Sequence, residues 1–94
     1  MLVALPGEPF LETGDAVATG VLAAAEARAD DVRAVVVAGY SGGTPGYLPT
    51  ARAWPEGGYE VADAHRYYAM PAPFAPEAAA IVEREAVLAC PIVR

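Results

Sequence analysis

The sequence predicts a small α/β domain: a short β-α-β unit with parallel strands, followed by a glycine-rich loop and a C-terminal helix. Residues 34–38 form an apolar run without alternation, which is typical of a strand covered on both faces. A second apolar run, residues 2–5, precedes it by more than the dozen or so residues that a helical crossover needs. Residues 39–50 then hold four of the nine glycines, so a bent loop follows the strand.

The first strand and the first helix follow from apolar spacing. Residues 2–5 are apolar and end at a Pro-Gly turn, which predicts a brief buried strand. The pattern then becomes helical over residues 12–29, where Val17, Val21 and Ala24 recur at the i, i+4, i+7 spacing of one helix face. These positions predict the side of the helix that packs on the sheet.

Single residues refine the helix and the elements after it. Thr13 suits the N-cap of the first helix. Gly20 costs about 1 kcal/mol relative to alanine inside a helix, so we expect a close helix–strand contact there. The second strand is predicted over residues 33–39. Pro76 fits the first position of a second helix, over residues 76–89. Its predicted inward residues are Ala78, Ile81, Val82, Ala86 and Ala89.

Charge and composition exclude several classes of protein. The net charge is −6, and the six basic residues are arginines without a cluster, which argues against nucleic acid and anionic membrane surfaces as partners. No apolar run reaches the roughly 20 residues of a membrane span, and no signal peptide is visible, so the compartment stays open. The single cysteine, Cys90, excludes an internal disulfide and a cysteine-based zinc cage.

Large apolar side chains are sparse in this chain. It has two phenylalanines and one tryptophan, and much of its apolar content is alanine, which buries little area. A short chain also buries a modest fraction of its surface. We therefore expect the unit to need contacts with other protein in order to bury enough apolar surface, either as a fragment of a larger α/β domain or as a homo-oligomer.

The glycine-rich loop contains a possible serine nucleophile. Residues 39–43, Gly-Tyr-Ser-Gly-Gly, match the G-x-S-x-G elbow of α/β-hydrolases, with Ser41 as the nucleophile. Asp63 and His65 follow in the chain order of the hydrolase triad. However, residues 44–46, Thr-Pro-Gly, occupy the place where the elbow's helix should begin, and Asp63 and His65 lie only two positions apart. Serine hydrolase is therefore kept as an alternative.

Three segments, taken in order, carry a family resemblance. Residues 6–10 read Pro-Gly-Glu-Pro-Phe, residues 47–50 read Tyr-Leu-Pro-Thr, and residues 57–61 read Gly-Gly-Tyr-Glu-Val. With the predicted helix and the valine-rich strand between the first two, this order resembles the C-terminal part of the catalytic domain of neutral/alkaline non-lysosomal ceramidases of the bacterial type. The resemblance spans residues 5–61, with a weaker helical match near residues 75–88.

The resemblance implies a zinc-dependent amidase that cleaves the N-acyl bond of ceramide-like lipids. The family's glutamate and tyrosine zinc ligands fall here on Glu8 and Tyr47, and its two histidine ligands and its serine nucleophile would lie upstream, outside this chain. A carboxylate and a phenolate are hard oxygen donors, and zinc lowers the tyrosine pKa from its usual value near 10. The 94 residues alone would then be inactive.

A non-enzymatic function is the third interpretation. The glycine-rich loop and its tyrosines can form a protein interface instead of a site. A tight dimer that buries Tyr40, Tyr47 and Trp54, without metal or activity, would favour such an interaction module.

Overall fold

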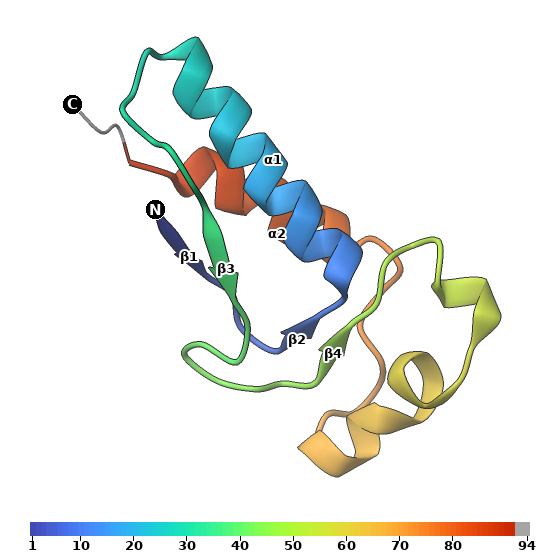
Figure 1. Ribbon diagram of the computed structural model, residues 1–94. Coiled ribbons are helices and arrows are strands. Elements are labelled where there is room, and N and C mark those ends of the chain that lie inside the picture. Colours follow the sequence, from blue (N-terminus) through green and yellow to red (C-terminus); the bar gives the residue numbers. More distant parts are fainter. Residues whose placement is uncertain (92–94) are drawn as a thin grey trace.

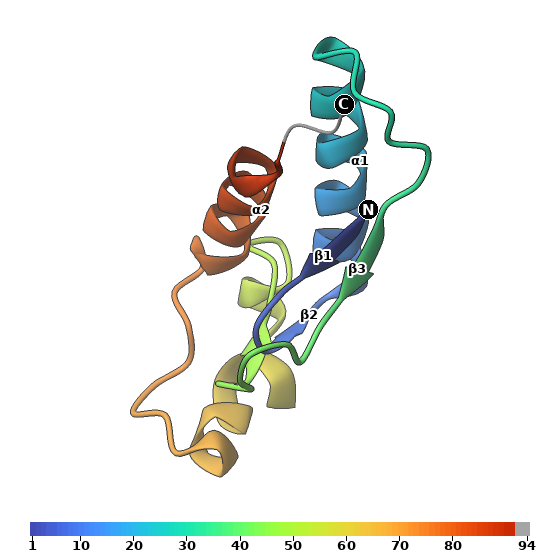
Figure 2. The same cartoon turned by 90° about the vertical axis from the view of Figure 1, so that its left-hand side faces the viewer.

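The structure is a computed structural model that describes residues 1–91, and it places two helices on one face of a short parallel sheet (Figure 1). Figure 2 shows the same layers from the side, with the two helices next to each other. The elements are β1 (Leu2–Ala4), β2 (Glu8–Pro9), α1 (Leu11–Ala27), β3 (Val36–Ala38), β4 (Tyr47–Leu48) and α2 (Ala78–Ala89), with short helical turns at Trp54–Glu56, Tyr59–Asp63 and Ala64–Tyr68.

The predicted β-α-β unit is confirmed. Strands β1 and β3 pair in parallel, with Val3 opposite Val37 in the register. Both strands are shorter than the predicted ranges, residues 2–5 and 33–39. The ladder begins where the Val36 N–H donates to the Met1 carbonyl at 2.9 Å, and before it the Met1 amino group donates to the Ala34 carbonyl at 2.7 Å.

Helix α1 begins earlier than the predicted residues 12–29. Its N-cap is Phe10, and the expected cap, Thr13, lies fully buried inside the first turn. The Phe10 carbonyl accepts from the N–H groups of Thr13, at 3.0 Å, and Gly14, at 3.2 Å. The helix therefore starts directly after β2 without a side-chain cap, because the preceding strand already fixes the entry of the chain.

The core lies between the sheet and the two helices. Leu5, Val17 and Val21 are buried at its centre, as the helical spacing predicted for the two valines. The predicted close contact at Gly20 exists, but the prediction that it involves a strand is wrong. A Cβ there would lie 2.7 Å from Cγ2 of Val87, so the close contact is between α1 and α2. Gly20 lets two helices, and not a helix and a strand, approach closely.

Helix α2, predicted over residues 76–89, begins two residues later. Val82 and Ala86 pack against the core as expected. The predictions that Ile81 and Ala89 face inward are wrong, since both residues are exposed, and Val87 takes part in the core instead. Helix α2 packs mainly against α1 and less against the sheet. Its buried side chains therefore lie on a different face from the one that packing on the sheet alone would bury.

One face of the sheet stays bare. Leu2 is 67% exposed and Val36 is 62% exposed, on the side away from the helices. Parallel sheets are usually covered on both faces. The radius of gyration is 14.2 Å, whereas a compact domain of this length has about 12 Å. The described chain therefore leaves apolar sheet surface that a further layer of protein can cover.

Candidate metal site

Glu8 and Tyr47 lie side by side in the structure. They sit on β2 and β4, a second parallel pair that the sequence did not predict, in which Glu8 is the register partner of Tyr47 and Pro9 that of Leu48. The Glu8 N–H also donates to the Gly46 carbonyl at 2.9 Å. Register partners of a parallel pair project from the same face. The two residues that the family resemblance singles out are thus adjacent, although they are far apart in sequence.

Glycine at position 7 makes this pairing possible. Its φ of +67° lies in the left-handed region, and a Cβ would come within 2.6 Å of the Gly46 carbonyl oxygen. Its N–H donates to the Gly43 carbonyl at 3.1 Å. The Pro-Gly turn and the glycine-rich loop therefore touch backbone to backbone, and this contact holds Glu8 against Tyr47.

The Glu8 carboxylate interacts with two phenols. The pKa of Tyr47 is raised to about 12, first by hydrogen bonding to Glu8 and then by partial burial and the charge of the carboxylate. The pKa of Tyr40 is raised to about 12 by the same causes in the same order. A negative carboxylate accepts a hydrogen bond from a neutral phenol and opposes its ionisation. Without a cation, both tyrosines are therefore neutral at ordinary pH.

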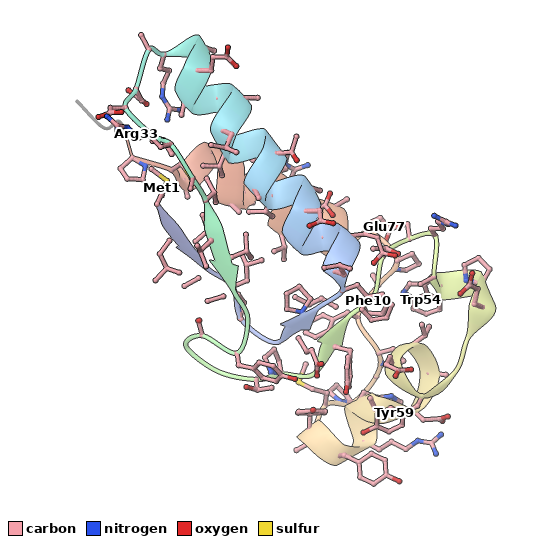
Figure 3. The ribbon with its side chains drawn as sticks, in the orientation of Figure 1. Met1, Phe10, Arg33, Trp54, Tyr59 and Glu77 are labelled. Atoms are coloured by element: carbon pink, nitrogen blue, oxygen red, sulfur yellow. The ribbon has the colours of Figure 1, made fainter. Side chains whose placement is uncertain are left out.

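Further tyrosines surround Tyr47. Its ring meets those of Tyr59 and Tyr68 edge-on, with centroids 5.9 and 6.4 Å apart, and the ring of Tyr67 lies 6.0 Å from that of Tyr59. Burial is the first cause that raises the pKa of Tyr59. Figure 3 shows Tyr59 on the turns below β4. The sequence predicted no role at the site for these rings, and the Tyr-Glu of residues 59–60 was the one signal that could have found them.

An open hollow of about 410 Å³ adjoins the Glu8–Tyr47 pair. Glu12, Glu56 and Glu60 add carboxylates to its lining. Phe10, Leu11 and Val61 add apolar surface. The hollow thus brings acidic and apolar side chains together, with the acidic groups able to attract a cation.

The donor set fits half of a zinc site. Glu8 and Tyr47 supply two oxygen ligands, whereas a catalytic zinc takes about three protein ligands. Within residues 1–91, no group of three His, Cys, Asp or Glu side chains is placed to hold a metal ion. Cys90 is far from this site in the fold, where its thiol donates to the Ala86 carbonyl at the end of α2.

Ser41 lies in a different setting from an elbow serine. Its Oγ is 3.2 Å from the Gly39 carbonyl oxygen and 3.3 Å from that of Ala38, so the hydroxyl donates to backbone. The chain after it stays irregular up to β4, and no helix starts there. The turn that an elbow needs, with a helix N–H for the oxyanion, is thus missing from this part of the chain.

Comparison with known proteins adds no family assignment. No family model, curated protein or solved structure matches the chain. Among the described helices, α1 and α2 included, none has the length and apolar character to cross a membrane. Function is therefore inferred from the geometry around Glu8 and from the order of the motifs.

The interaction of Glu8 with its two phenols leads to a first prediction. Glu8→Gln should lower the pKa of Tyr40 and Tyr47 from about 12 toward their ordinary value near 10, because it weakens hydrogen bonding to the neutral phenols and removes the charge that opposes ionisation. An ultraviolet titration of phenolate absorbance measures this shift. Glu12→Gln is the matched control, since Glu12 lines the same hollow but is not among the causes of either pKa shift. Equal titration curves for Glu8→Gln and the parent chain would contradict the contact.

Proposed function

We propose that this chain is the metal-site-bearing segment of a zinc-dependent amidase that hydrolyses the N-acyl bond of ceramide-like lipids, and that it is inactive alone. One observation carries the proposal: Glu8 and Tyr47, the positions matched to the ceramidase ligands, are register partners in β2 and β4. The pairing arises from the Pro-Gly-Glu turn and the Tyr-x-x-Thr segment, the two motifs on which the resemblance depends.

The remaining ligands are two histidines from an upstream part of a larger domain. A carboxylate and a phenolate with two imidazoles give a four-ligand shell of the kind that zinc accepts. When bound, zinc supplies Lewis-acid polarisation of a carbonyl group. The role of this chain is to hold Glu8 and Tyr47 at the ion and to keep the Tyr47 oxygen available as a ligand.

The hollow beside the pair supports a lipid amide as the substrate. Phe10, Leu11 and Val61 give it an apolar wall beside the carboxylates and Tyr47. An acyl chain can lie on the apolar wall while its amide approaches the Glu8–Tyr47 pair.

The bare face of the sheet supports a larger assembly. Exposed Leu2 and Val36 leave apolar surface on the side opposite the helices, which the rest of the domain can cover. The same observation favours a second candidate, a non-enzymatic interaction module that covers this face by self-association. Sedimentation distinguishes them, because a stable dimer that forms without metal supports the module.

Zinc titration followed by calorimetry tests the proposed function. We expect weak binding by the parent chain, because two oxygen ligands cannot form a closed site. Glu8→Ala and Tyr47→Phe should each remove that binding, and Glu12→Ala is the control that should not. Tight one-to-one binding that survives both substitutions would overturn the ligand assignment and direct attention to His65 and Cys90. Upstream in-frame sequence should also encode two well-separated histidines and a serine in glycine-rich surroundings.

A further inference from the structure

Residues 50–57 form a segment whose hydrogen bonds stay within it. The Thr50 carbonyl accepts from the N–H groups of Ala53, at 3.1 Å, and Trp54, at 3.2 Å. The N–H groups of Glu56 and Gly57 also donate to carbonyls inside the segment. Within residues 1–91, no hydrogen bond or ion pair joins the segment to another element. The segment can therefore move as one piece without breaking the strand pairs.

The chain on both sides of this segment is fixed. Leu48 and Pro49 are buried before it, and Val61 is buried after it. Between the segment and Val61, Gly57 has a φ of +66° and a ψ of −140°, and Gly58 has a φ of +87° and a ψ of −178°. Residues other than glycine rarely adopt such angles. Two adjacent glycines can absorb the backbone changes of a hinge.

Trp54 is the side chain that anchors the segment. It is the one large apolar residue among residues 50–57, it is half-buried, and Figure 3 shows it on the side of its turn that faces Phe10. Its Nε1 is buried and has no hydrogen-bond partner in the described part of the chain. A buried indole N–H usually finds a partner, and an unpaired one opposes burial. Apolar contact therefore holds Trp54 in place, while its N–H favours a return to water.

The segment forms one wall of the hollow beside Glu8 and Tyr47. Residues 53, 56 and 57 line the hollow on this side, and residues 10–12 line it from the start of α1. A shift of the segment relative to α1 would change the width of the hollow. Segments that open and close over a site in this way control access to it and exclude water from it.

We propose that residues 50–57 are a lid that opens and closes the hollow, with Gly57 and Gly58 as its hinge and Trp54 as its anchor. The movement is a property of the segment itself. Only the role assigned to it, the admission of an amide lipid to the hollow, rests on the proposed function.

Hydrogen exchange of the whole chain, without metal or lipid, tests the lid. The amides to follow are those that donate inside the segment (Ala53, Trp54, Glu56 and Gly57) and two that donate within the sheet (Leu5 and Val36). We expect the segment amides to exchange together, more slowly than in an unstructured peptide but at least about ten-fold faster than the sheet amides, because local opening exposes them. Exchange at the rate of the sheet amides, or at that of an unstructured peptide, would overturn the lid.

Trp54→Ala tests the anchor. It should raise the rates of the segment amides about ten-fold or more, because it removes the apolar contact that holds the lid closed, and leave the sheet amides unchanged. Arg52→Ala is the matched control, since Arg52 is exposed in the same segment. Equal segment rates in the two variants, or an equal rise at the sheet amides in Trp54→Ala, would contradict the anchor.

The lid and the proposed function fail separately. A lid that does not open leaves the assignment of Glu8 and Tyr47 standing, because zinc titration tests that assignment without reference to residues 50–57. Zinc binding that survives Glu8→Ala and Tyr47→Phe refutes the proposed function, whereas the exchange rates still decide whether the segment opens.

Discussion

Gly7→Ala should destabilise the chain by about 3 kcal/mol and separate β2 from β4. An alanine at a φ of +67° costs about 1–2 kcal/mol, because its Cβ crowds the following carbonyl. The same Cβ would lie 2.6 Å from the Gly46 carbonyl oxygen, and this backbone atom cannot move away without breaking the Glu8 hydrogen bond. Overpacking of this kind typically costs about 1–3 kcal/mol more. Chemical denaturation measures the sum.

Gly42→Ala is the matched control for this prediction. Gly42 also has a left-handed φ, +72°, but a Cβ there would meet no heavy atom within 4 Å. It should therefore show only the conformational cost of about 1–2 kcal/mol. Equal destabilisation by Gly7→Ala and Gly42→Ala would mean that the contact between turn and loop does not hold the site. We also expect the pKa of Tyr47 to fall toward its ordinary value in Gly7→Ala, as its partner moves away.

Gly20→Leu should destabilise the chain by about 2 kcal/mol through the contact of α1 with α2. Even the first carbon of the new side chain would meet Val87 Cγ2 at 2.7 Å, and valine has a stiff side chain that cannot turn aside. The overpacking cost, at the upper end of about 1–3 kcal/mol or above it, exceeds the gain of about 1 kcal/mol in helix propensity. Thermal unfolding followed by circular dichroism measures the loss.

Gly14→Leu on the same helix supplies the control. No heavy atom lies within 4 Å of a Cβ at Gly14, so the substitution should be neutral or stabilising by up to about 1 kcal/mol. Val87→Ala combined with Gly20→Leu should recover part of the loss, because it removes the methyl group that clashes. If Gly20→Leu and Gly14→Leu have the same stability, the two helices do not pack as closely as the structure has them.

The β-α-β unit was predictable because its signals are long. The helix has enough turns for its apolar period to be recognised, and the run of valines without alternation indicates a buried strand. The length of the crossover then predicts that the two strands are parallel. The helix boundary at Thr13 and the inward side of Ile81 were wrong because tertiary contacts decide them. A preceding strand fixes the start of α1, and packing on α1 rotates α2.

The candidate site was less predictable, because a strand of two residues is too short to show the apolar pattern by which strands are recognised in a sequence. β2 and β4 leave no pattern in the sequence, so only the family resemblance joined Glu8 to Tyr47 before the structure brought them together. The left-handed φ of Tyr40 was not predictable, because residue preferences argue against it at a tyrosine.

The central claim is that Glu8 and Tyr47 are two ligands of one zinc ion. Anomalous diffraction at the zinc edge, from crystals of the chain soaked in zinc, tests it most directly. The expected result is one peak about 2.0–2.2 Å from an oxygen of each side chain. Crystals of Glu8→Gln, the control, should lack that peak. A peak at His65 or Cys90, with none between Glu8 and Tyr47, would contradict the claim.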